Sequence, residues 1–176
     1  MFRHPAQDLD PVDAALLQRL QDDCKASLSR LGDEVGLSAP AVMKRLRKLE
    51  AAGFVRGYHA LLEGRALGLD ITAFVGLTIN FPKNIEEFAR ILEDLDEVQE
   101  CHHVTGKHSL LLKVRARNTA ALEDLISRLQ RIDAVQGTET NIVLSTRKES
   151  SKLPLGHLAP KAIAETPAGT VTRDLH

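Results

Sequence analysis

Residues 35–50, VGLSAPAVMKRLRKLE, contain the clearest structural signals in the N-terminal third of the chain. Gly36 breaks an apolar pattern of helical spacing, and Ser38 is a residue type that caps the start of a new helix. Pro40 is tolerated in a first helical turn, and the helix is expected to end near Ala52, before a glycine. Two helices joined by a short turn that contains glycine are typical of a helix-turn-helix.

The last helix of this pattern has one apolar side and one basic side. At about 100° per residue, Val42, Leu46 and Leu49 fall on the same side and predict a buried stripe. Across residues 38–58 five basic side chains stand against one acidic side chain, Glu50. Because the whole chain has a net charge of only −1, these residues form a local basic stripe. A helix that only supports a scaffold usually carries both signs of charge, so the stripe favours DNA binding.

The expected DNA contacts follow from the way such a helix enters the major groove with its N-terminus. Base edges are expected to meet Pro40, Ala41 and Lys44, whereas the later basic side chains grip phosphates. Arg45 lies at the boundary of the two sides, so its guanidinium is expected to reach a phosphate or an acidic neighbour. The full set of expected DNA-binding residues is Ser38, Ala39, Pro40, Ala41, Lys44, Arg45, Arg47, Lys48 and Arg56.

Further elements are expected on either side of this pair. Asp10 and Pro11 predict the start of a first helix that fades near Asp22, and Ser27 caps a second, short helix. Beyond Gly53, the run 54–60 alternates between apolar and polar residues and predicts a short strand, the wing of a winged helix-turn-helix. Within that run, Phe54 and Tyr58 are expected to pack in the core, and Arg56 to touch the DNA backbone.

A different pattern begins at Ile71, where β-branched residues predict strands and capped stretches of helical spacing predict helices. The expected elements are a strand over 71–79, a helix after Asn84, strands over 98–105 and 109–116, a helix after Asn118 or Thr119, and a strand over 137–146. The order β-α-β-β-α-β predicts a ferredoxin-like sheet with both helices on one face. The predicted class is therefore α+β, an N-terminal winged helix-turn-helix followed by a ferredoxin-like domain.

Two helices can cover only one face of this sheet. We expect apolar side chains from Leu110 to Val114 and from Ile142 to Leu144 on the other face, which then needs a partner. A symmetric face-to-face homodimer, able to assemble into a higher homo-oligomer, is the predicted solution.

The predicted organisation is a DNA-binding domain over 1–60, a hinge over 61–70, a ferredoxin-like domain over 71–150 and a flexible tail over 151–176. Leu153 and Leu155 in the tail are expected to pack on the last strand or on a neighbouring subunit. The two cysteines are far apart and suit a reducing compartment. No run approaches the roughly 20 apolar residues of a membrane span, so we expect a cytoplasmic protein with no membrane partner.

A helix-turn-helix followed by β-α-β-β-α-β resembles the Lrp/AsnC family of bacterial and archaeal feast/famine regulators over about residues 9–150. The motifs that carry the resemblance are Val35-Gly36-Leu37-Ser38, Val42, Arg45-Leu46, Leu49-Glu50, 53–58, Val104-Thr105-Gly106 and 138–145. The resemblance implies dimers that bind double-stranded DNA and often form tetramers or octamers. It also implies a small effector, commonly an amino acid, at interfaces between C-terminal domains, and hence a sequence-specific transcriptional regulator rather than an enzyme.

The turn between the second and third strands departs from the family pattern, which is usually Gly-x-aromatic-Asp. Here it reads Gly106-Lys107-His108-Ser109, so the carboxylate that would favour an ammonium group is missing and the turn is more positive. We therefore expect an acidic or neutral ligand, or none. The expected effector residues, which offer hydroxyls and an accessible backbone, are Thr105, Gly106, Lys107, His108, Ser109, Thr138 and Thr140.

Three further hypotheses need weighing. Catalysis would draw on Cys101, His102, His103, His108 and Ser109, but neighbouring residues of a strand point to opposite faces, so these side chains do not converge. The same thiol and imidazoles are good zinc ligands, which gives a metal-responsive regulator as an alternative that metal analysis would test. Because no tight ligand spacing is present, no metal or other cofactor is expected. The third alternative is a ligand-independent architectural protein that organises DNA. DNA affinity measured with and without metabolites separates it from a ligand-gated regulator.

Overall fold

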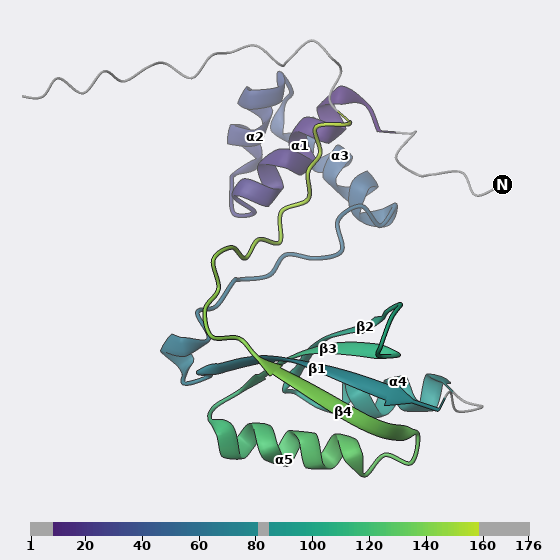
Figure 1. Ribbon diagram of the computed structural model, residues 1–176. Helices are drawn as coiled ribbons and strands as arrows, with labels where there is room; N and C mark the ends of the chain where they lie inside the picture. The colour runs from purple at the N-terminus through teal and green to yellow at the C-terminus, as the bar shows by residue number, and fades with distance from the viewer. Residues whose placement is uncertain (1–8, 81–84, 159–176) are drawn as a thin grey trace, which may run out of the picture. The chain divides into compact units, whose positions relative to one another are not determined.

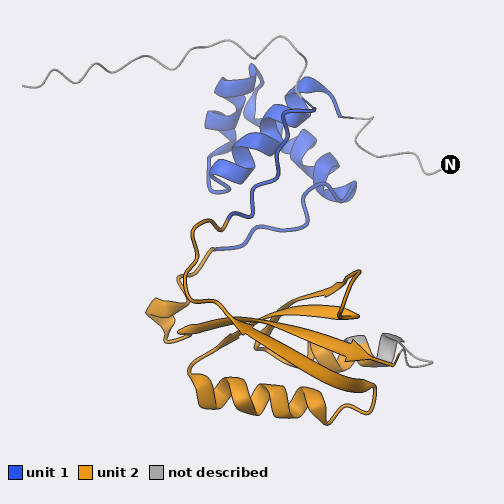
Figure 2. Ribbon diagram, viewed as in Figure 1, with its two compact units in different colours: residues 1–60, 150–176 blue, residues 61–149 orange. Residues whose placement is uncertain are grey.

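The computed structural model describes residues 9–80 and 85–158, and the chain divides into two compact units (Figures 1 and 2). The first unit comprises residues 1–60 together with 150–176, and the second comprises residues 61–149. The predicted α+β class is confirmed, because helices form the first unit and a four-stranded antiparallel sheet with helices forms the second.

Three helices build the first unit: α1 (Pro11–Asp22), α2 (Leu28–Val35) and α3 (Ala39–Ala51). The predicted caps of α1 and α2 are present: the Asp10 carboxylate accepts from the Asp13 amide at 2.8 Å, and the Ser27 hydroxyl accepts from the Arg30 amide at 3.2 Å. Ser38 precedes α3 in an extended conformation, but its hydroxyl caps no amide. The prediction of a Ser38 side-chain cap is therefore wrong. Pro40, at the second helical position, has no N–H and so removes one of the two amides that such a cap uses.

The turn between α2 and α3 depends on two glycines. Gly36 has a positive φ of 71°, a conformation that side chains with a Cβ rarely adopt. At Gly32 a Cβ would overlap the carbonyl oxygen of Leu37, so the turn can pack against α2 only without a side chain there. The core that this turn closes consists of Leu16, Leu31, Val42, Leu46 and Leu49.

The predicted wing strand over 54–60 does not form. The amides of Phe54 and Val55 both donate to the carbonyl of Leu49, at 2.9 and 3.4 Å, and close the end of α3. These two donors are therefore not available to a strand, and residues 56–60 pair with no strand of the described chain. Phe54 packs partly against the core as predicted. Tyr58 does not: it is 46% exposed.

The second unit begins with a 3₁₀ turn over Arg65–Leu67 and then forms β1 (Ile71–Ile79), α4 (Ile85–Glu93), β2 (Val98–His103), β3 (Leu110–Ala116), α5 (Thr119–Gln130) and β4 (Val135–Ile142). The strands lie in the order β2-β3-β1-β4, with every neighbouring pair antiparallel, and α5 runs alongside β4 (Figure 1). Asn118 caps α5 by accepting from the Ala121 amide at 2.9 Å. The predicted cap at Asn84 lies outside the described residues.

The last strand lies earlier than predicted, over 135–142 instead of 137–146. Its pairing with β1 ends at Ala73 and Ile142, and one more amide, that of Val143, reaches the Thr72 carbonyl at 2.9 Å. Because β1 begins at Ile71, little backbone remains beyond this point for β4 to pair with.

The helix-covered face of the sheet holds the core. Its buried residues on β1 and β3 alternate strictly, at Ala73, Val75, Leu77, Ile79, Leu110, Leu112, Val114 and Ala116, and Phe88, Leu92, Leu122, Leu125 and Leu129 cover them. The prediction that residues 110–114 lie on the uncovered face is therefore wrong. In the pairing of β3 with β1, Leu111 is the one apolar residue of this run that lies on the uncovered face. Ile142 pairs with Ala73 on the helix-covered face, and Leu144 lies 92% exposed beyond the strand.

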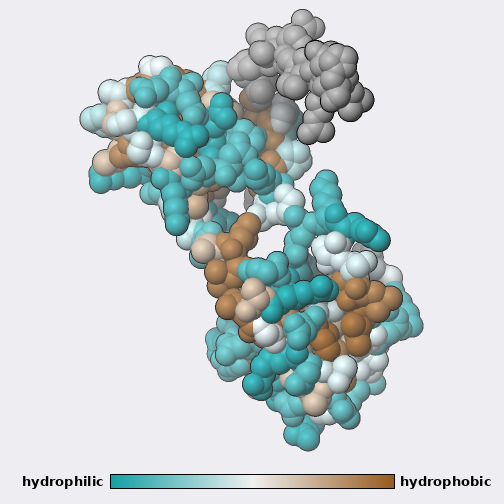
Figure 3. Space-filling model, turned by 90° about the vertical axis from the view of Figure 1, so that its left-hand side faces the viewer, coloured by the Kyte–Doolittle hydropathy of each residue, from teal (hydrophilic) through white to brown (hydrophobic). Residues whose placement is uncertain are grey.

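We call the face not covered by α4 or α5 the open face. It carries Phe74 and Gly76 of β1, and Leu111, Lys113 and Arg115 of β3. It is therefore mixed in polarity, and the view in Figure 3 shows hydrophobic and hydrophilic surface side by side on the second unit.

Candidate functional site

The outward side of α3 carries the predicted basic residues. Ser38, Pro40, Lys44, Arg47 and Lys48 are exposed. Within residues 9–80 and 85–158, the cationic groups of Lys44, Arg47 and Lys48 form no ion pair. Three positive charges without a negative partner are suited to bind a polyanion.

Two smaller residues and one apolar residue complete this surface. Ala39 and Ala41 are half-buried at the start of α3, and Met43 is exposed between them and the basic side chains. Met43 was not among the predicted contacts, although its position 100° from Val42 places it on the outward side at helical spacing. A thioether there offers an apolar contact surface, such as one for a thymine methyl group.

Arg45 points inward, toward two carboxylates at the start of α1. Its Nη1 atom lies 2.5 Å from an Asp10 carboxylate oxygen and 2.8 Å from one of Asp13, which is only 2% exposed. The hydrogen bonds that the Arg45 guanidinium donates to these two carboxylates raise its pKa. Burial alone would raise the pKa of Asp10, but the Asp13 amide and the Arg45 guanidinium outweigh burial and hold this pKa below its usual value. The two expected partners of Arg45 are a DNA phosphate and an acidic neighbour. The structure shows the acidic neighbours, Asp10 and Asp13, so the Arg45 guanidinium is not free to bind a phosphate.

Segment 56–60 follows α3 without regular structure. Arg56 is exposed there and pairs with no acid in the described part of the chain. The Tyr58 hydroxyl donates to a Glu50 carboxylate oxygen at 2.9 Å. Partial burial and Glu50 together raise the pKa of Tyr58 to about 12, so this contact ties the segment to the end of α3 as a neutral phenol.

The second predicted site is the turn between β2 and β3. Gly106 has a φ of 112°, which requires glycine. The Ser109 amide donates to the Leu77 carbonyl at 2.9 Å, and the Ser109 hydroxyl accepts from the Ile79 amide at 3.3 Å. Ser109 therefore joins the turn to β1, and its hydroxyl already has a partner.

His108 lies across the open face beside Gly76, where a Cβ would overlap its ring. Its Nε2 atom is 3.8 Å from a Glu139 carboxylate oxygen, and Lys107 forms an ion pair with the same carboxylate. The hydrogen bond from Lys107 is the first cause of the lowered pKa of Glu139. The Nδ1 atom of His108 is buried and has no hydrogen-bond partner within the described residues.

Thr138 and Thr140 do not join this turn. They pair with Leu77 and Val75, so their side chains lie on the helix-covered face, whereas Glu139 pairs with Gly76 on the open face. The Thr138 hydroxyl accepts from the Gln130 side-chain amide at 2.9 Å. The predicted effector set is therefore split between the two faces of the sheet.

Glu139 is the residue that the sequence interpretation missed at this site. Alternation along a strand predicts that it faces away from its two threonine neighbours, which was the available signal. Its carboxylate places a negative charge beside Lys107 and His108, so the prediction that this turn has no negative charge is wrong.

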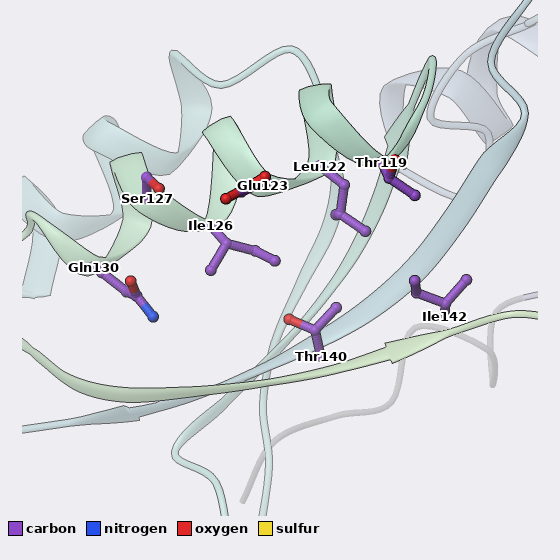
Figure 4. Close-up of a pocket in the computed structure, with 8 residues that line it drawn as sticks. All are labelled: Thr119, Leu122, Glu123, Ile126, Ser127, Gln130, Thr140 and Ile142. Atoms are coloured by element: carbon purple, nitrogen blue, oxygen red, sulfur yellow. The ribbon is translucent and has the colours of Figure 1, made fainter.

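A groove lies between α5 and β4 on the helix-covered face (Figure 4). It has a volume of about 410 Å³ and is lined by Thr119, Leu122, Glu123, Ile126, Ser127, Gln130, Thr140 and Ile142. It mixes hydroxyl and amide groups with aliphatic side chains, and Thr140 is the only predicted effector residue among those lining it.

The residues considered for a metal site are not brought together. Cys101 and His103 pair with Leu112 and Leu110 on one face, whereas His102 pairs with Leu111 on the other and lies 3.1 Å from Glu100. Burial raises the pKa of the Cys101 thiol, which disfavours the thiolate. Among the described residues, no group of three or more His, Cys, Asp or Glu side chains is arranged to hold a metal ion. No helix in the described ranges is long and apolar enough to span a membrane.

Two protein-family models match the chain. The AsnC-type helix-turn-helix domain matches residues 9–50, and the Lrp/AsnC ligand binding domain matches residues 72–153. The leucine-responsive regulatory protein of Escherichia coli K12 is 37% identical over 154 residues, covering 86% of this chain and 94% of that protein.

Solved structures show the same relationship. A transcriptional regulator of Neisseria meningitidis in complex with L-methionine matches with a TM-score of 0.80 and 33% identity, covering 85% of this chain and 99% of that one. A feast or famine regulatory protein of M. tuberculosis, complexed with L-methionine, matches with a TM-score of 0.76 and 36% identity, covering 82% and 98%.

Proposed function

The chain is a transcriptional regulator of the Lrp/AsnC family, and we propose that it reads DNA with the outward side of α3. One observation carries this proposal: Lys44, Arg47 and Lys48 face outward and have no acidic partner among the described residues, whereas Arg45 is held by Asp10 and Asp13. A helix-turn-helix presents such a helix to the major groove, N-terminus first.

The position of each side chain along α3 separates base contacts from phosphate contacts. Pro40, Ala41 and Lys44 lie in the first turns and are assigned to base edges, together with Met43. Phosphate contacts are assigned to Arg47, Lys48 and Arg56, with Ser38 and Ala39 at the helix start close to the backbone. Arg45 is withdrawn from the DNA contacts, because its guanidinium is occupied within the first unit.

Replacing Lys48 by alanine tests the phosphate assignment. Affinity is expected to fall similarly on every DNA sequence, and the slope of log K against log salt should become shallower by about one unit. Fluorescence anisotropy over a salt series measures both quantities. Lys148→Ala, at an exposed lysine with no ion pair in the described chain, is the matched control and should change neither. An unchanged slope in Lys48→Ala would remove Lys48 from the phosphate contacts.

We also propose a homodimer formed through the open face. Phe74 and Leu111 lie at its centre, and the nearby Lys113 is already paired with Glu100 at 3.2 Å, so packing two such faces need not bury an unpaired charge. Light scattering at micromolar concentration should give at least a dimer, and Phe74→Lys should shift it toward monomer. The exposed Leu144→Lys serves as the control. A stable wild-type monomer would contradict the proposal.

The effector proposal centres on the turn 105–109 together with Glu139. Lys107 can meet a ligand carboxylate, and Glu139 can meet an ammonium group, so a neutral zwitterionic amino acid fits this pair of charges best. Thr138 and Thr140 are withdrawn from this site, since they line the other face.

Calorimetry with acidic, neutral and basic amino acids tests this charge argument. Neutral amino acids should bind most tightly, and Glu139→Gln should weaken them about tenfold by removing the ammonium partner. Tight binding of lysine or arginine that His108→Ala and Glu139→Gln leave unchanged would place the ligand elsewhere. Absence of binding across the panel would favour the ligand-independent architectural alternative, which the internal pairing of Ser109 and Lys107 also favours.

A further inference from the structure

The C-terminal segment 150–158 belongs to the first unit, although it follows the last strand of the second. The Gln21 side chain, near the end of α1, holds the backbone of Leu153 on both sides. Its carbonyl oxygen accepts from the Leu153 amide at 2.6 Å, and its amide group donates to the Leu153 carbonyl at 3.2 Å. The ammonium group of Lys152 lies 2.6 Å from the Asp22 carboxylate. Within the described chain the Leu153 side chain is 68% exposed and does not pack on the last strand as predicted, whereas its backbone is clamped to α1. Packing on a neighbouring subunit stays a prediction.

The other end of this connection is fixed within the second unit. The Glu149 carboxylate lies 2.7 Å from the Lys113 ammonium group and 3.8 Å from the Arg115 guanidinium, both on the open face. The Arg115 guanidinium also lies against Gly64, where a Cβ would overlap it. One arginine therefore borders both places where the chain passes between the units, the segment around 61–64 and the exit at 149.

From these two sets of contacts we propose that 150–158 form a strap, a second connection between the units that is clamped to α1 by Gln21 and Asp22 and limits the orientations of the helix-turn-helix. A unit joined by one flexible linker can reorient widely, whereas a second fixed connection removes most of that freedom. The consequence for DNA rests on the proposed DNA-binding function; the clamp itself does not.

The strap acts on the recognition helix through α1. Its contacts are at the C-terminal end of α1, and the N-terminal end of the same helix carries Asp10 and Asp13, which hold Arg45 of α3. Because α1 is one continuous helix of 12 residues, a restraint at one end fixes the other. Gln21 is thus a positioning residue for α3 rather than a DNA contact.

Amide hydrogen exchange on the full chain, resolved to single residues, tests the clamp without DNA. The Leu153 amide should exchange about tenfold more slowly than an unprotected amide, and Gln21→Ala should abolish that protection. Lys148→Ala, in the chain just before the strap, should leave it intact. Random-coil exchange at Leu153 in the wild type, or protection that survives Gln21→Ala, overturns the proposal.

DNA sites with altered half-site spacing test the restraint. The wild type should bind a site lengthened by half a helical turn more weakly than the normal site. In the double variant Gln21→Ala, Lys152→Ala, the ratio of these two affinities should fall about threefold or more. A protected Leu153 amide with unchanged discrimination overturns the restraint and leaves DNA binding standing. If the wild type binds no DNA at all, the proposed function is overturned, and the hydrogen-exchange result still tests whether the clamp exists.

Discussion

Replacing Arg45 by alanine should lower the free energy of unfolding by about 2–4 kcal/mol. The reason is the carboxylate left behind. Asp13 is almost fully buried, and Arg45 is its cationic partner at 2.8 Å. Removing one member of a buried pair leaves an uncompensated charge, which costs more than the pair contributes. Urea denaturation followed by circular dichroism measures the loss.

Two controls separate this effect from a simple loss of charge. Arg47→Ala removes a cation two residues away on the exposed side of α3 and should change stability by no more than about 0.5 kcal/mol. Asp13→Asn in the Arg45→Ala background should recover part of the loss, because the buried charge is then absent. If Arg45→Ala and Arg47→Ala unfold at the same urea concentration, the guanidinium does not hold α1 to α3.

Arg45 also shows how far a sequence can predict a side chain's partner. Helical geometry places it at the edge between the apolar and basic sides, which leaves a phosphate and an acidic neighbour as equal expectations. The choice depends on Asp10 and Asp13, which lie more than 30 residues earlier and reach Arg45 only once α1 packs on α3. Local periodicity contains no information on that packing.

The helices and strands themselves were largely predictable because their signals are local. Ser27 and Asn118 cap helices by bonding amides three residues away, and β1 has the β-branched composition of a buried strand. The prediction of a wing failed because a strand needs a partner: the Phe54 amide bonds to Leu49 at the end of α3, and residues 56–60 pair with no strand of the described chain.

The predictions of which residues lie on the open face and at the effector turn were wrong for a related reason. Alternation predicts that Thr138 and Thr140 share a face and that Glu139 takes the other, but not which face the helices cover. That choice is set by register, through pairs such as Val75 with Thr140 and Gly76 with Glu139. Assigning the faces therefore required the pairing of strands distant in the sequence.

Exchanging both Lys44 and Arg47 for alanine should weaken binding to a specific DNA site about 100-fold at physiological salt. One base-edge contact and one phosphate contact are lost, each worth about 1–2 kcal/mol. Stability should hardly change, since both side chains are exposed and form no ion pair in the described chain.

The matched control replaces Arg117 and Arg131, two exposed arginines of the second unit, by alanine. It removes the same charge and should reduce affinity far less. Full affinity in the Lys44, Arg47 variant would mean that the basic side of α3 does not meet DNA, and equal losses in both variants would reduce its role to net charge. A large loss of affinity in the Lys44, Arg47 variant alone would instead place the recognition surface on the outward side of α3, opposite the contact of Arg45 with α1.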